Sequence, residues 1–289
     1  MLITVRLDDN LRLAGALLAA GTWPEWEQKQ KPYKPHRVAE GARKYFAPYR
    51  MHPAVLRAQA LAGNGEGVPE LLGQALESAW PGSLGTELAD FVAAARPQDF
   101  WAETDADWQA AIHELGEVLA RADLGQFLAD FFGPPTCPLA LAPNLLFPGQ
   151  RCLAWTASEA LLVYAPPPLA WGTSPPWRYN ERPDEVLAMV CQAYAGVLFA
   201  QHLPGLAAVK VTAGAEALAL AAAVLFLRQA EGDAAGDQFM VIQKKVRGWR
   251  GLPGVVSALA ALLAARRAGT GAALADGLPE LTGLLEQLT

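Results

Sequence analysis

Histidine is scarce in this chain of 289 residues, and charged residues make up only 18% of it. An average soluble domain has about 25% charged residues. Apolar residues account for 52% of the sequence, so the chain can bury enough surface to offset the conformational entropy lost on folding, and intrinsic disorder is excluded. The few histidines limit the acid–base and metal chemistry that the chain can support; they are His36, His52, His113 and His202.

Short motifs for phosphate binding and for serine hydrolysis are absent. The sequence contains neither a G-x-x-x-x-G-K-[S/T] loop nor a G-x-G-x-x-G turn after a strand, and it has no G-x-S-x-G nucleophile elbow. We therefore expect no cofactor.

An overall excess of positive charge is also absent, because 23 Lys and Arg face 29 Asp and Glu and leave a net charge of −6. Nucleic-acid-binding proteins normally have a basic excess, so a nucleic acid is not the expected partner. The stretch from Lys29 to Arg50 is locally basic and aromatic. It is either a nucleic-acid surface or a solvated face whose aromatic residues pack inward, and the net acidity favours the second. The same interpretation applies to a smaller cluster around Trp249, formed by Lys244, Lys245, Arg247 and Arg250.

Long hydrophobic runs are missing. The longest, Ala217 to Leu227, has eleven residues between Glu216 and Arg228, whereas a membrane-spanning helix needs about 20. It predicts a buried core helix and no membrane insertion. The N-terminus shows no basic region followed by an apolar one, so no secretory signal is expected.

Cysteine is rare and widely spaced, at Cys137, Cys152 and Cys191. An odd number without a C-x-x-C pair predicts neither a disulfide framework nor a zinc ribbon, and it favours a cytoplasmic location.

Helical periodicity dominates what is present. We expect helices after Asp8, at 36–46, 53–61, 68–80, 84–95, 105–121 and 124–132, then at 184–202, 213–230, 238–246, 252–268 and 278–288. Between the two sets, the segments 139–147, 151–155 and 160–164 predict a small strand meander.

The predicted fold class is α+β and mostly helical, with a small antiparallel or mixed sheet between an N-terminal helical part and a C-terminal helical bundle. The expected division is into residues 1–135 and 136–289, packed as one unit.

The helix predicted after Asp105 contains the most suggestive short string, His113-Glu114-Leu115-Gly116-Glu117. A zinc peptidase needs His at the first and fifth positions, with Glu beside the first. Here the fifth residue is Glu117, and the apolar stripe around Trp108 and Leu115 places His113 and Glu117 on the wet face. A solvated His–Glu pair is the favoured interpretation.

The segment Ala165 to Arg182 is rich in Pro and Trp, and we expect it to be an irregular connection. Connections of this length are often lids or binding loops. It is either a ligand or peptide wall formed by Trp171, Trp177, Arg178 and Tyr179, or a proline-stiffened surface connection. Cys191, in the middle of an apolar helix, is expected to be a buried, inert thiol.

In order along the chain, these segments resemble a bacterial family of predicted zinc peptidases of the gluzincin type, built around His-Glu-x-x-His. The resemblance covers most of the chain. It rests on Leu11 to Gly15, on Tyr45 to Val55, on Asp90-Phe91 and on the helix that ends at Phe131-Phe132-Gly133. It implies a gluzincin-like arrangement of helices around the small sheet.

By this resemblance the helix from Asp184 takes the place of the metal-binding helix, and Met189, Val190 and Ala193 stand where the family has His, Glu and His. Glu216 falls where the family has its third ligand. Met, Val and Ala cannot replace imidazole ligands or the general base, so the resemblance implies a degenerate metal site, without a bound metal and without catalytic residues.

Two functions of different classes follow. The first is a catalytically inactive peptidase-like protein with a binding or structural role, whose partner is an unknown peptide or protein. Its cleft would lie between the strands 151–164 and the helix from Asp184, and a peptide would bind there by adding a strand. The alternative is a metal-dependent hydrolase with a non-standard site made from His113, Glu114, Glu117 or His202 with Glu216.

Overall fold

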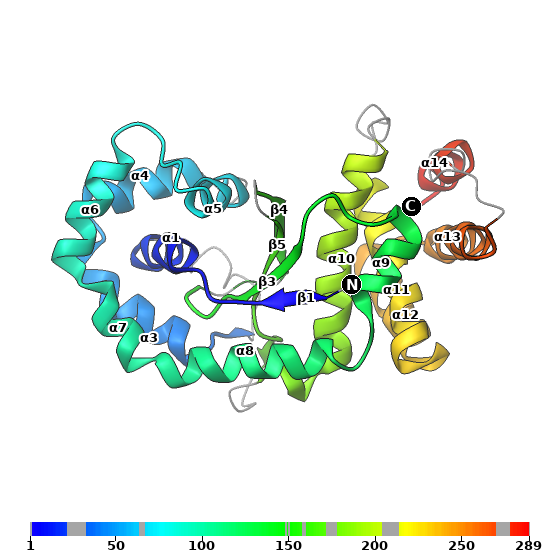
Figure 1. Ribbon diagram of the computed structural model, residues 1–289, viewed down its shortest axis with the longest axis horizontal. Coiled ribbons are helices and arrows are strands. Elements are labelled where there is room, and N and C mark those ends of the chain that lie inside the picture. The colour runs from blue at the N-terminus through cyan, green and yellow to red at the C-terminus, as the bar shows by residue number, and fades with distance from the viewer. Residues whose placement is uncertain are drawn as a thin grey trace. The chain divides into compact units, whose positions relative to one another are not determined.

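Helices make up most of the chain, and a small mixed sheet accompanies them, as the sequence predicts (Figure 1). The computed structural model describes residues 2–21, 33–63, 67–147, 149, 151–157, 160–171, 178–203, 214–269 and 278–288. The chain divides into two units. The sheet unit comprises Thr4–Glu117 and Ala140–Arg182, and the bundle unit comprises Met1–Ile3, Val118–Leu139 and Pro183–Thr289. The boundary expected after residue 135 lies within the Val118–Leu139 segment, and it stays a prediction, as does the gluzincin-like arrangement.

Helix α1 (Asp9–Ala20) lies at the centre of the helices of the sheet unit. Its N-cap is Asp8, whose carboxylate accepts a hydrogen bond from the Leu11 N–H at 3.0 Å. Figure 1 shows the helices that follow as an arc around α1. They are α3 (Arg37–Phe46), the 3₁₀ turn η1 (Ala47–Tyr49), α4 (Pro53–Ala62), α5 (Val68–Leu76), α6 (Leu84–Ala95), α7 (Pro97–Glu103) and α8 (Asp105–Leu119), the last of which ends in the bundle unit. The residues of α1 from Ala14 to Ala20 are buried, and the helix packs against α3, α4 and α5.

Helix α7 is an element that the sequence did not predict. Pro97 comes two residues after the end of α6 and suggests a stop, but Arg96 between them adopts a left-handed conformation with φ of 47° and turns the chain into a new helix. Proline at the first helical position is compatible with that start, because its missing N–H has no partner there.

The sheet contains four strands in the order β1 (Ile3–Val5), β3 (Leu139–Pro143), β5 (Leu161–Ala165) and β4 (Leu153–Thr156). The predicted meander was wrong in its order, because β5 and not β4 occupies the inner position. All residues of β5 are buried, whereas those of β4 are intermediate or exposed, which suits an edge. Strands β4 and β5 form an antiparallel pair in which Leu153 faces Tyr164.

The connection predicted between 165 and 182 is more ordered than expected in its described parts. Strand β6 (Ala170–Trp171) pairs antiparallel with β2 (Tyr33–Lys34), so two distant segments are joined there. A 3₁₀ turn, η2 (Tyr179–Glu181), follows. Residues 172–177 lie outside the described part of the chain.

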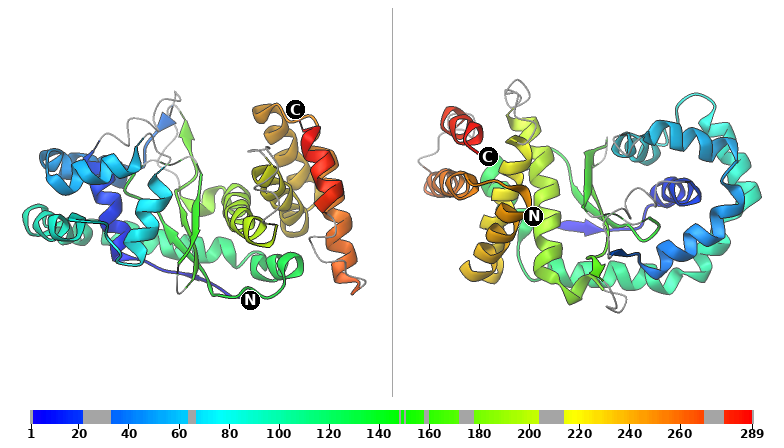
Figure 2. Two further views of the ribbon diagram at one scale, coloured as in Figure 1. Left: turned by 90° about the horizontal axis from the view of Figure 1, so that it is seen from above. Right: turned by 180° about the vertical axis from the view of Figure 1, so that it is seen from behind.

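The bundle unit is built around α11 (Gly214–Glu231), which packs on α10 (Pro183–His202), α12 (Asp233–Arg247) and α13 (Leu252–Arg267); Figure 2 shows these helices from two further directions. Helices α9 (Leu124–Phe132) and α14 (Leu278–Glu286) complete it. Every residue from Ala217 to Leu227 is buried, which confirms the predicted core helix. Aromatic rings join α9 to its neighbours, with centroids 5.1 Å apart for Phe127 and Phe226 and 4.8 Å apart for Phe132 and Phe199.

Within the described residues, no helix is both long enough and apolar enough to cross a membrane.

Candidate ligand-binding pocket

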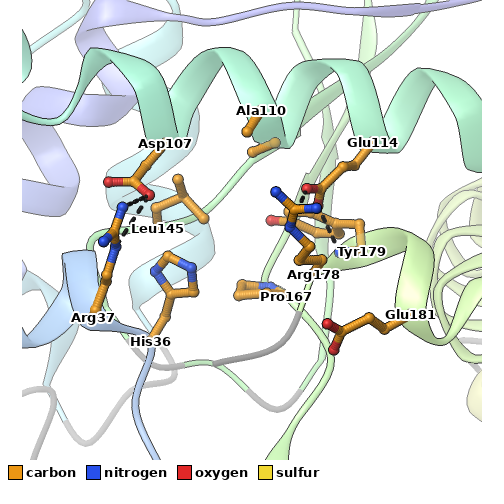
Figure 3. Close-up of a pocket in the computed structure, with 11 residues that line it drawn as sticks. His36, Arg37, Asp107, Ala110, Glu114, Leu145, Pro167, Arg178, Tyr179 and Glu181 are labelled. Carbon is orange, nitrogen blue, oxygen red and sulfur yellow. Dashed lines mark hydrogen bonds and ion pairs between the residues drawn. The ribbon is translucent and has the colours of Figure 1, made fainter. Parts of the chain in front are cut away.

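Glu114 on α8 is the one charged residue that is buried in the described part of the chain. Its side chain is 8% exposed. The Tyr179 backbone N–H donates to its Oε2 at 3.0 Å, and the Arg178 Nε lies 3.1 Å from its Oε1 (Figure 3). A carboxylate loses much hydration free energy when it is buried, so partners of this kind are required to keep it there.

The position of Glu114 on α8 explains why helical periodicity alone does not predict its burial. His113 and Glu117 are 76% and 49% exposed and lie 3.3 Å apart, which confirms the predicted solvated pair. Glu114 lies between this wet face and the apolar stripe of Trp108 and Leu115. The chain around Tyr179, 65 residues later, covers it.

A pocket of about 450 Å³ opens beside Glu114 within the sheet unit, a volume in the range of small-molecule sites. One face of α8 forms its wall, with Asp107, Ala110, Ala111 and Glu114 at helical spacing. Leu145 and Pro167 also line it (Figure 3).

Each end of this α8 wall holds an ion pair (Figure 3). At one end Arg37, the first residue of α3, donates from Nε at 3.2 Å and from Nη2 at 2.5 Å to the same oxygen of Asp107. At the other end Arg178 pairs with Glu114 through Nε. The two arginine side chains are 68% and 65% exposed, so their outer edges face solvent.

The electrostatics of the two ends differ. Burial raises the pKa of Glu114, and repulsion from Glu117 and Glu181 adds to the rise, while the Tyr179 N–H and Arg178 oppose it. At the Arg37 end, burial lowers the pKa of His36 to about 4, with a smaller opposing effect of Asp107. The His36 imidazole is therefore neutral at pH 7, and its Nδ1 accepts a hydrogen bond from the Val38 N–H at 3.2 Å as the N-cap of α3.

The proposed wall residues of the Pro- and Trp-rich segment are only partly described. Trp177 and the side chain of Trp171 lie outside the described part of the chain. Arg178 lines the pocket, and Tyr179 is buried with its hydroxyl donating to the Ala165 carbonyl at 2.7 Å. Both residues contact Glu114, which the sequence assigns to the alternative hydrolase site and not to this segment. The sequence did not indicate Asp107 or Glu181 as pocket residues.

The positions expected for a degenerate metal site lie on α10 and α11. Met189, Val190 and Ala193 are on α10, where Val190 is fully buried and the other two are half-buried. Glu216, in the first turn of α11, forms an ion pair with Arg247. No group of three His, Cys, Asp or Glu residues that could hold a metal occurs among the described residues. The assignment of these positions to a lost zinc site stays a prediction.

The aromatic residues of the basic stretch have structural contacts. Tyr45 and Phe46 pack against Phe100, with ring centroids 5.1 and 5.6 Å away. The Tyr45 and Tyr49 hydroxyls donate to the carbonyls of Arg96 and Ala94. These rings are therefore not arranged as free stacking platforms for bases; residues 29–32 lie outside the described chain.

Cys191 is fully buried, as expected, and burial raises the pKa of its thiol, so the reactive thiolate is disfavoured.

The chain has also been compared with known proteins: no family model, no curated protein and no solved structure matches it.

Proposed function

We propose that this chain is a catalytically inactive, peptidase-like binding protein, and that its ligand binds in the pocket beside Glu114. The observation that carries the proposal is the buried Glu114 carboxylate in a pocket wall. An apolar side chain of similar size would avoid the desolvation cost, so a carboxylate held by Tyr179 and Arg178 favours a role in recognition.

The groups around the pocket favour binding over covalent chemistry. None of the described lining residues is Ser, Thr or Cys, and the Tyr179 hydroxyl is committed to the Ala165 carbonyl. His36, the one histidine among them, uses its Nδ1 to cap α3. A nucleophile next to a free general base is thus not among these residues.

The ancestry part of the proposal rests on the sequence resemblance to gluzincin-type peptidases. Met189, Val190 and Ala193 offer no imidazole or carboxylate, and Glu216 is engaged by Arg247. Purified protein loaded with equimolar zinc and then passed through a desalting column is expected to retain less than a stoichiometric amount. One tightly bound zinc ion, lost on Glu216→Ala, would support the hydrolase alternative instead.

Pocket binding is tested by filling the cavity. Ala110 lines the pocket, whereas Ala106 is exposed on the same helix, so Ala110→Phe and Ala106→Phe form a matched pair. We expect small polar molecules that raise the melting temperature of the wild type to do so in Ala106→Phe but not in Ala110→Phe. Ligands that stabilise both variants equally, or a broad panel without any hit, would contradict the proposal.

A further inference from the structure

The two ends of the pocket wall are separated by a distance that a small ligand can span. Asp107 and Glu114 are seven residues apart on α8, which corresponds to about 10 Å along the helix axis. Figure 3 shows Arg37 beside the first of these residues and Arg178 beside the second, with Ala110 between them. A ligand along this wall therefore meets both ion pairs.

The Arg37 end has capacity for an anion. The Nε and Nη2 groups of Arg37 both bind the same oxygen of Asp107, and Nη1 has no hydrogen-bond partner among the described residues. A guanidinium group has five N–H donors and pairs well with carboxylates. The N-terminus of α3, a helix of ten residues, adds partial positive charge at this end.

The Arg178 end has an excess of negative charge. Arg178 is the only cation lining this end in the described structure; it pairs with Glu114, and Glu181 adds a second carboxylate to the lining. Figure 3 shows Glu181 on the same side of the pocket as Arg178. Its carboxylate forms no ion pair with a described residue, and its charge acts on Glu114. A cationic group at this end would relieve that repulsion.

Apolar side chains line the pocket between the two ion pairs. Ala110 and Ala111 lie on α8 between Asp107 and Glu114, and Leu145 and Pro167 also line the pocket (Figure 3). Their side chains offer no hydrogen bond, so this part suits methylene groups.

Building on the proposed function, we infer that the pocket binds a zwitterion whose carboxylate and ammonium groups are about 10 Å apart, with the carboxylate at Arg37 and the ammonium at Glu181 and Glu114. A dianion would place its second charge against Glu181, and a dication would face Arg37. Two sources share the required chemistry. They are a peptide of about three residues, at roughly 3.5 Å per residue, and an unbranched ω-amino acid of similar length.

Titration calorimetry of the full chain at pH 7.5 and low salt tests this inference. The probes are triglycine and 8-aminooctanoate as the two zwitterions, with octanoate, octylamine and suberate as the anion, cation and dianion of comparable length. Glycine is the short control. We expect at least one zwitterion to bind about tenfold more tightly than each single-charge or dianionic probe. Binding of triglycine alone identifies a peptide ligand, and binding of 8-aminooctanoate alone identifies an aliphatic one.

Variants that each remove one charge test which group of the ligand binds at each end of the pocket. Glu181→Gln should lower zwitterion affinity about tenfold while leaving octanoate binding unchanged or stronger, and Arg37→Gln should lower the affinity for both. Glu103→Gln and Arg50→Gln are matched controls, because both residues are exposed and neither lines the pocket; they should bind as the wild type does.

The outcomes separate this inference from the proposed function. If octanoate, octylamine or suberate binds as tightly as the zwitterions and Ala110→Phe abolishes that binding, the pocket is a binding site but the ligand class is wrong. If neither zwitterion binds, the inference is overturned, and the wider panel then decides the proposed function. Equal affinity of Glu181→Gln and wild type for the zwitterion would also overturn it.

Discussion

His36 combines two structural roles at the start of α3. Its imidazole caps the helix through Nδ1 and is half-buried beside the Arg37–Asp107 pair. A protonated imidazole could not accept the Val38 N–H, so the capped state requires the neutral form.

The pH dependence of stability should report this residue. The folded-state pKa of His36, about 4, is below the usual value of 6.5, so the native state resists protonation. The stabilising contribution is complete above pH 6.5 and is lost as the pH falls from 6.5 to 4. In urea unfolding, moving from pH 7.5 to pH 4.5 should cost the wild type about 2–3 kcal/mol more than it costs His36→Asn, which keeps a capping side chain. Parallel pH profiles for the two proteins would refute this explanation.

Glycines in helices show how local and tertiary effects compete. In α8, a Cβ at Gly116 would meet no atom within 4 Å, whereas in α1 a Cβ at Gly15 would lie 2.8 Å from Leu146 Cδ1. We expect Gly116→Ala to stabilise the protein by about 0.5–1 kcal/mol through helix propensity. Gly15→Ala should destabilise it by about 1–2 kcal/mol, because overpacking outweighs the same gain. Denaturant midpoints that shift in the same direction would contradict this contrast.

At the scale of elements, α11 depends on small side chains. Alanine occupies much of the buried run from Ala217 to Leu227, which allows α10 to approach closely; a Cβ at Gly196 of α10 would lie 3.8 Å from the Ala219 Cβ. The larger residues of this run are buried as well, and α11 also packs against α12 and α13. Dense packing of this kind makes α11 sensitive to cavities.

Truncation of one aliphatic side chain in each helix should show that α11 contributes more than the surface of α12 to the free energy of unfolding. Leu220 is fully buried, and Ile242 on α12 is 49% exposed. Leu220→Ala should lower the free energy of unfolding by about 2–5 kcal/mol, because the lost burial is accompanied by a cavity. Ile242→Ala should change it by less than about 1 kcal/mol. Chemical denaturation measures both, and a similar loss in the two variants would show that the surface of α12 is covered in solution.

At the scale of the whole molecule, the net charge is negative. The net charge is −6, and the basic side chains Arg37, Lys44 and Arg57 each pair with an acidic partner. These pairs reduce the positive potential that a polyanion would meet.

Retention on a heparin column measures this property. We expect the protein to elute in the flow-through at pH 8 and about 50 mM salt. Its net charge is negative, and the basic side chains named above are already paired with carboxylates rather than available to the anionic groups of heparin. Strong retention that weakens steeply with salt would favour a nucleic-acid-binding surface.

Local signals in the sequence were sufficient for most helices. The bounds of α6 and α9 match the prediction, and Asp8 and His36 cap helices that periodicity had indicated. Helical periodicity and caps act over a few residues, so they can be recognised without knowledge of the fold. The burial of α11 was predictable for the same reason, because eleven consecutive apolar residues have no wet face.

Only the tertiary structure decided the strand order and the pocket. Strand β1 joins β3 from the far N-terminus, and β5 takes the inner place that the meander had assigned to β4. Glu114 is buried because Tyr179 and Arg178 cover it, and Arg37 meets Asp107 across 70 residues. Such contacts depend on which distant segments the folded backbone brings together, and the spacing of residues along one helix contains no information about them.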